Sequence, residues 1–258
     1  MKPSHASIVE EMRKFVGSIL GPYGDGKRPD NLDGLDYDFF GHKDLNLRFN
    51  KFSNRILKMM TDCSSHEGFE EVDDDAVSAM SYKYTTHAMD YVMKKVEHVA
   101  MEGCKIFVKR AHVLFNQKRE SLLQTYGDGL LEYLEVGSSK FISKASSGVV
   151  ALKKINDRGG SPRYKISCVR ECCDIILTST TAKDEGEKEG GENESKPIGA
   201  DDLMPMLIYI ITTSPPPNLL ANLNYIESYS TRELLIGETG YCLCAVSSAV
   251  EWIKSWKA

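Results

Sequence analysis

The segment GPYGDGKRPD, which begins at Gly21, is the first stretch of the chain whose residue types could do chemistry. Gly21, Gly26 and Lys27 have the spacing of a phosphate-binding loop. Such a loop also needs a hydroxyl directly after the lysine to hold Mg²⁺, and a helix that opens there and aims its N–H groups at phosphate. Arg28 and Pro29 follow the lysine and remove both features. We therefore interpret this segment as an ordinary glycine and proline turn.

The carboxylates that come next could in principle bind Ca²⁺. They are Asp30, Asp33, Asp36 and Asp38, and they lack the alternating aspartates and the closing glutamate of an EF-hand. A solvated turn is the favoured interpretation.

Histidines and cysteines are the side chains that could hold zinc. His87, His98 and His112 lie in helical patterns without a histidine or cysteine partner at i, i+4. Cys168 and Cys172 are four residues apart and so face the same way on a helix, where buried cysteines act as small hydrophobic residues. We predict no metal site and no catalytic constellation of the hydrolase type.

The composition sets the class of protein. The chain has 258 residues, of which 41% are apolar and 27% charged, which is enough for one large or two small cores. Its net charge of −5 argues against nucleic-acid binding, which needs a basic face. The apolar runs are too short to cross a bilayer, and residues 1–14 carry acids and no hydrophobic signal region. We expect a soluble intracellular protein whose cysteines are reduced thiols.

The first half of the chain has helical periodicity. Apolar positions predict a helix over residues 4–20 capped by Ser4, and further helices over 45–60, 76–101 and 104–126. Between 129 and 155 we expect short helices interrupted at Gly137 and Gly148, and Pro162 should open the next helix. Residues 183–196 contain no apolar side chain and are predicted to form a charged, flexible acidic loop.

The stretch from residue 199 to 253 predicts helix, proline turn, helix, short turn, helix. Asp201 and Asp202 precede an apolar stripe, as in an amphipathic helix with an acidic N-cap. Pro205 fits if that helix begins just before it, so that the proline lies in the first turn. The prolines at 215–217 then end the helix, and glycines at 237 and 240 open the last one.

Several motifs in this stretch resemble the vacuolar protein sorting nine (Vps-nine) domain. They are GADDLMP from Gly199, the run P-P-x-L-x-x-N-L-x-Y-I that ends at Ile226, and GETGY, with SPRYK and CVRECCDII upstream. The resemblance implies an all-α fold, in which an N-terminal helical bundle over residues 1–125 packs on a helical Vps-nine-like domain over residues 126–258 that contains the acidic loop.

The family consists of guanine-nucleotide exchange factors for early-endosomal Rab GTPases of the Rab-five subfamily. The resemblance implies that Asp201 is the catalytic acid, inserted into the phosphate and Mg²⁺ site of the GTPase. It places Asp202, Pro205 and Tyr241 at the partner-binding surface, together with Cys244 and Asn222. From the residues alone, the local pattern favours Asp201 as a helix cap, and Tyr241 is equally well explained as a half-buried helix residue.

This chain departs from the family pattern at three places. It has Pro215 where the family usually has asparagine, and Cys244 and Ala245 where threonine and asparagine are common. Two functions therefore stay open: an exchange factor that promotes GDP release from an early-endosomal Rab, or a Rab-binding or scaffold module with weak or lost exchange. Either would do no covalent chemistry and would need no cofactor of its own, since the GTPase carries GDP or GTP and Mg²⁺. Recruitment to early endosomes would be peripheral, through a partner.

Overall fold

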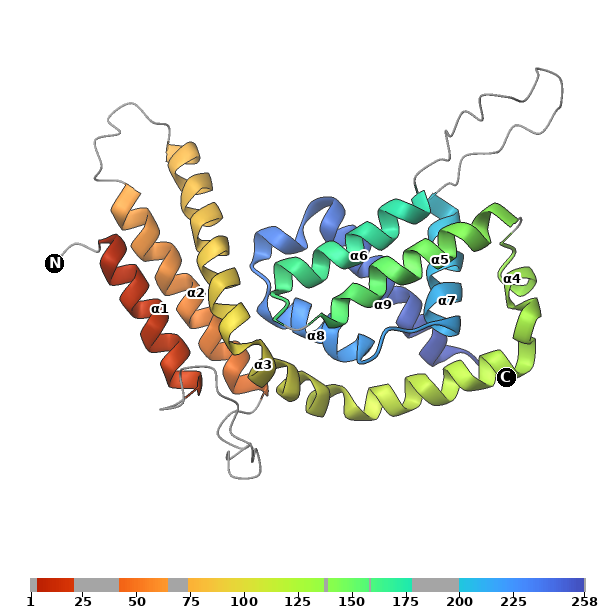
Figure 1. Ribbon diagram of the computed structural model, residues 1–258. Helices are drawn as coiled ribbons and strands as arrows, with labels where there is room; N and C mark the ends of the chain where they lie inside the picture. The colour runs from red at the N-terminus through yellow and green to blue at the C-terminus, as the bar shows by residue number, and fades with distance from the viewer. Residues whose placement is uncertain are drawn as a thin grey trace, which may run out of the picture. The chain divides into compact units, whose positions relative to one another are not determined.

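The computed structural model describes residues 4–20, 42–64, 74–136, 139–157, 159–177 and 200–257 (Figure 1). Within these ranges every regular element is a helix, which confirms the predicted all-α class. The α-helices are α1 (His5–Leu20), α2 (His42–Ser64), α3 (Asp74–Tyr126), α4 (Leu130–Tyr133), α5 (Ser139–Lys153), α6 (Pro162–Leu177), α7 (Ala200–Thr213), α8 (Leu219–Tyr229) and α9 (Gly237–Ser255). Short 3₁₀ turns η3 (Gly127–Gly129), η4 (Lys154–Asn156) and η5 (Arg232–Leu235) join some of them.

The chain divides into two compact units. Unit 1 contains residues 1–110, 156–166 and 218–237, and unit 2 contains 111–155, 167–217 and 238–258. The units are interleaved along the chain, so they differ from the sequence domains 1–125 and 126–258, whose boundary stays a prediction. The acidic loop at 183–196, the glycine turn at 21–30 and the aspartate cluster at 30–38 lie outside the described residues.

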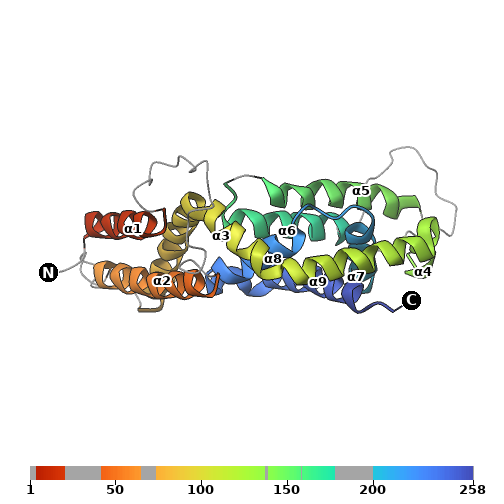
Figure 2. The same cartoon turned by 90° about the horizontal axis from the view of Figure 1, so that it is seen from below.

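In unit 1, helices α1 and α2 lie side by side (Figure 1 and Figure 2). The predicted cap of α1 is confirmed: Ser7 N donates to Ser4 Oγ at 3.3 Å, and Ser4 N donates to Ser7 Oγ at 2.8 Å. Phe15 of α1 stacks on Phe52 of α2 at a ring-centroid distance of 4.1 Å. Helix α8 supplies Tyr229 to the same core, edge-on to Phe49 at 5.5 Å.

The break expected between residues 101 and 104 is absent, because α3 runs through Gly103 as one helix of 53 residues. A glycine inside a helix costs only about 1 kcal/mol relative to alanine. The residues around it are well buried: Ala100 and Cys104 are fully covered and Met101 nearly so. Burial of a large apolar side chain such as Met101 contributes about 1.5–3 kcal/mol, which offsets the cost of the glycine.

In unit 2, helix α5 likewise continues through Gly148, where an interruption was predicted. Gly148 lies against α7, since a Cβ built on it would be 3.0 Å from Ile210 Cδ1. The glycine therefore allows α5 and α7 to approach closely where the two helices cross (Figure 1). Also in unit 2, Leu122, Leu130 and Trp256 form a small apolar cluster.

Among the described residues, no helix combines the length and the apolar character needed to cross a lipid bilayer. All seven cysteines are free thiols. The described part of the chain contains no group of three or more histidine, cysteine, aspartate or glutamate side chains able to hold a metal ion.

Candidate functional site

The start of α7 holds the two aspartates that the sequence singled out. The helix begins at Ala200, so Asp201 and Asp202 both lie in its first turn rather than before it. Asp202 is half-buried. The first turn of a helix has unpaired N–H groups and the positive end of the helix dipole, and both favour an ionised carboxylate there.

The prediction that Pro205 lies in the first turn of α7 is wrong, because this proline lies inside the helix. Because proline has no N–H, it cannot donate to the carbonyl of Asp201 four residues earlier. An interior proline costs about 3 kcal/mol. The buried apolar face of α7 outweighs that cost, with side chains that are at most 3% exposed: Leu203, Met206, Leu207, Ile208, Ile210 and Ile211.

The far end of α7 is held by a cation. Arg119 of α3 donates from Nη1 to the carbonyl oxygen of Thr212 at 3.2 Å, and both residues belong to unit 2. The last carbonyls of a helix have no internal partners, so a basic donor there is stabilising. No local sequence pattern indicates this contact, because the two residues are 93 positions apart.

Tyr241 and Cys244 lie three residues apart on α9 and therefore share a face of that helix. Both are exposed, Tyr241 with 50% of its surface. Ala245, the other departure from the family pattern, is buried and packs inward with Cys242 and Val246. The exposed face of α9 can thus present an aromatic ring and a thiol to a partner, whereas Ala245 serves the core.

The first turn of α9 is tied to α6 within unit 2. Arg170 of α6 forms an ion pair with Glu238 of α9, Nη2 to Oε2, at 2.5 Å, and also lies 3.4 Å from Asp174 on its own helix. Both partners of the α6–α9 pair are partly exposed, so its contribution to stability is small, about 0–1 kcal/mol. The pair joins α6 to the first turn of the helix that carries Tyr241.

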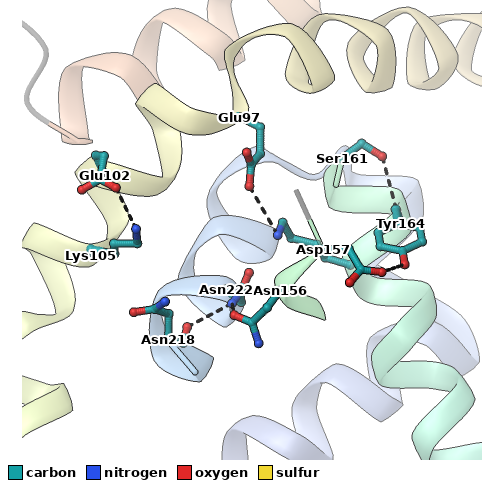
Figure 3. Close-up of polar contacts among 10 residues, drawn as sticks. Glu97, Glu102, Lys105, Asn156, Asp157, Ser161, Tyr164, Asn218 and Asn222 are labelled. Atoms are coloured by element: carbon teal, nitrogen blue, oxygen red, sulfur yellow. Dashed lines mark hydrogen bonds and ion pairs between the residues drawn. The ribbon is translucent and has the colours of Figure 1, made fainter. Parts of the chain in front are cut away.

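Asn222, expected at the partner surface, has no exposed surface. It lies in α8 of unit 1, and its Nδ2 donates to Asn156 Oδ1 and to the carbonyl oxygen of Asn218, each at 3.1 Å (Figure 3). Asn218 itself has a positive φ of 54°, a conformation that asparagine tolerates better than most residues. We therefore assign Asn222 to the support of this turn and leave it out of the proposed contact surface.

The predicted order of helix, proline turn, helix, short turn and helix is confirmed by α7, α8, η5 and α9. Helices α7 and α9 belong to unit 2, as do Asp201, Asp202, Pro205, Tyr241 and Cys244. The site residues on these two helices are thus all parts of one compact unit.

Comparison with known proteins agrees with this arrangement. Residues 148–258 match the model of the vacuolar sorting protein 9 (VPS9) domain. The chain is 35% identical over 108 residues to vacuolar protein sorting-associated protein 9A of Arabidopsis thaliana, covering 40% of this chain and 19% of that protein. It is 31% identical over 118 residues to vacuolar protein sorting-associated protein vps901 of Schizosaccharomyces pombe, covering 46% and 18%.

A third relative is human Ras and Rab interactor 3, 33% identical over 96 residues that cover 37% of this chain and 9% of that protein. The match thus spans less than a fifth of the length of each of these three relatives. The match to the family model, over residues 148–258, includes α6 to α9 and all the candidate site residues. Residues 148–258 of the chain are therefore similar to the VPS9 domain.

Proposed function

We propose that this chain promotes GDP release from an early-endosomal Rab GTPase, with Asp201 as the catalytic acid. The observation that supports this most is the position of Asp201 in the first turn of α7, inside a matched VPS9 domain whose α9 exposes Tyr241. A relative with the words Ras and Rab in its name is consistent with a small GTPase as the partner.

The physical requirement for an exchange factor is differential affinity. A small GTPase holds its nucleotide through a lysine and backbone N–H groups of its phosphate loop and through Mg²⁺, which bridges the phosphates. A partner accelerates release only if it binds the nucleotide-free state better than the loaded state. A carboxylate that enters the phosphate site meets this requirement, because it pairs with the lysine, repels the phosphate and disfavours Mg²⁺.

The role of each site residue follows from its place on α7 or α9. Asp201 would supply the inserted carboxylate, and Asp202 would be its neighbour in the same turn. Tyr241 and Cys244 would contact the switch region of the GTPase from the exposed face of α9. Pro205, half-buried in α7, would lie beside the contact. The GTPase would bring GDP or GTP and Mg²⁺, and the chain would act on early endosomes as a peripheral protein recruited through a partner.

The test is the release of a fluorescent GDP from a panel of Rab GTPases by the unmodified chain. Two variants separate charge from helix capping: Asp201→Ala removes both, and Asp201→Asn keeps a polar side chain of equal size without the charge. We expect both to lower exchange by at least about 100-fold, on the scale of a lost charge-stabilising group, with unchanged helix content. Exchange that survives in Asp201→Asn would contradict the proposed role of the carboxylate.

Tyr241→Ala should weaken the complex with the nucleotide-free GTPase, and it has a matched control on the same helix. Glu251 is an exposed residue on the same side of α9, ten positions and about 15 Å along the axis from Tyr241, so Glu251→Ala should leave exchange and binding largely unchanged. Equal losses in both variants would indicate a general disturbance of α9 rather than a contact of the tyrosine ring.

A specific observation keeps the second function open. Cys244 is exposed on the same face of α9 as Tyr241, at a position where the family pattern differs. A changed contact surface of this kind could retain binding and lose exchange, as expected of a Rab-binding scaffold. Stable capture of a Rab by the unmodified chain without faster GDP release would support that function and contradict the first.

A further inference from the structure

Two cysteine thiols meet inside unit 2, where α6 and α9 pack together. Cys173 of α6 is 0% exposed and Cys242 of α9 is 1% exposed. The two side chains are hydrogen-bonded, with the Cys173 thiol as donor and the Cys242 sulfur as acceptor. One turn earlier on each helix, Arg170 and Glu238 form the ion pair described above. Two contacts one turn apart therefore hold the facing positions of these helices together.

The neighbouring thiols point elsewhere. Cys172 faces α5, because its Sγ would be 3.4 Å from a Cβ built on Gly148. Cys244 is exposed on the opposite part of α9. Cys172 and Cys244 thus point in other directions than the pair formed by Cys173 and Cys242, although all four residues lie on α6 or α9.

We propose that Cys173 and Cys242 form a reversible disulfide bond between α6 and α9 when the protein meets a hydroperoxide. This is a modification site that the exchange function does not require, and it would stand if that function proved wrong. A disulfide needs two sulfurs whose Cα atoms are within about 7 Å and whose Cβ vectors converge. The thiol–thiol hydrogen bond already brings the two sulfurs close together from facing helices.

The two sulfurs have different roles in the reaction. The pKa of Cys242 is lowered, chiefly by the hydrogen bond from Cys173 and also by the Arg170 guanidinium, against the opposite effects of burial and of Asp174 and Glu238. The pKa of Cys173 is raised, since it is the donor of that bond and is buried. Cys242 is therefore the attacking sulfur and Cys173 the resolving one, because the thiolate is the nucleophile in thiol oxidation.

The reaction balances with hydrogen peroxide as the oxidant. The Cys242 thiolate attacks one oxygen, the O–O bond breaks, and the departing hydroxide takes up the proton that Cys242 released. The product is a sulfenic acid and one water. The Cys173 sulfur then attacks the Cys242 sulfur, the S–O bond breaks, and the leaving oxygen takes the Cys173 proton as a second water. Two thiols are oxidised to one disulfide and the peroxide is reduced to two waters.

The burial of the pair sets the rate. Peroxide reaches these thiols only when the packing of α6 on α9 opens locally, so the bond should form more slowly than oxidation of the exposed Cys244. Cys244 is consequently an internal standard on the same helix, and its replacement by serine removes a competing reaction without touching the core.

The experiment uses the full chain, fully reduced and then treated with hydrogen peroxide. Remaining thiols are alkylated, the protein is digested without reductant, and the peptides are identified by mass spectrometry. We expect a crosslink between the α6 peptide at Cys173 and the α9 peptide at Cys242, lost again on addition of dithiothreitol. The Cys244→Ser variant should give the same crosslink, with an intact mass lower by two hydrogen atoms.

Cys173→Ser and Cys242→Ser should each abolish the crosslink, and circular dichroism will report whether they fold. Because the peptide map of the unmodified chain needs no core substitution, the test does not depend on these variants. The inference is overturned if Cys173 and Cys242 stay reduced after Cys244 is fully oxidised and the treatment is prolonged. It is also overturned if the crosslink joins Cys242 to Cys172, or if the two thiols go directly to sulfinic acids.

Discussion

The buried ion pair of unit 1 gives a prediction whose size follows from the structure. Lys165 Nζ lies 3.5 Å from Glu97 Oε1, and the two side chains are 1% and 15% exposed. The ammonium also lies 5.7 Å from the centre of the Tyr225 ring. Removal of one partner from a buried pair costs about 3–5 kcal/mol, because the other charge is left without compensation.

The cost should depend on which charge remains. Glu97→Gln leaves an ammonium with almost no access to water, and we expect a loss of about 4 kcal/mol in the free energy of unfolding even with the ring contact retained. Lys165→Met leaves a carboxylate that keeps some exposure, and we expect a smaller loss of about 3 kcal/mol. The double variant removes both charges and should lie within about 1 kcal/mol of the unmodified chain.

Urea-induced unfolding followed by circular dichroism measures all four proteins, and the double-mutant cycle gives the coupling energy. The reasoning is refuted if the single losses simply add in the double variant, or if Lys165→Met is clearly the more damaging change. Either result would mean that the pair contributes through side-chain packing rather than through charge.

Two further predictions concern packing and burial. Gly148→Ala should change the free energy of unfolding by less than about 1 kcal/mol, because the gain in helix propensity offsets the close contact with Ile210, whereas Gly148→Val should cost about 1–3 kcal/mol in the same urea titration. Burial raises the pKa of Cys104 from 9.0 to about 12, although Lys165 opposes the shift, so the folded state keeps this thiol protonated where the unfolded chain ionises. The stability that this group contributes is therefore complete below pH 9 and is lost as the pH rises toward 12, by at most about 1.4 kcal/mol per pH unit. Cys104→Ala should reduce the slope of the free energy of unfolding against pH, measured in unfolding titrations between pH 9 and 10.

Most helices could be predicted from apolar periodicity and caps, and the errors share one physical cause. Gly103, Gly148 and Pro205 were given the cost that a breaker has in an isolated helix, about 1 kcal/mol for glycine and 3 kcal/mol for proline. In this protein each lies in a helix with an extensively buried face, whose packing outweighs a local penalty. A single sequence reports the penalty directly but reports the packing only through its periodicity.

The candidate site likewise contains residues that local motifs indicate and contacts that the sequence does not indicate. Asp201 and Tyr241 could be proposed from the sequence because their motifs are local and contiguous with helical patterns. The burial of Asn222 could not, since its partner Asn156 is 66 residues away and the asparagine has the same type whether it faces solvent or the core. The ion pair of Arg170 with Glu238, 68 residues apart, was hidden for the same reason.

The make-up of unit 1 has a consequence for synthesis of the chain. Its core joins α1, α2 and the first part of α3 to Ala221, Tyr225 and Tyr229 of α8. The ribosome completes the first part of unit 1 at residue 110 and must then add 119 more residues (229 − 110) before Tyr229 exists. At about 5–20 residues per second this interval lasts roughly 6–24 s, during which the apolar faces of α2 and α3 await α8 and are open to other contacts, including those of a chaperone.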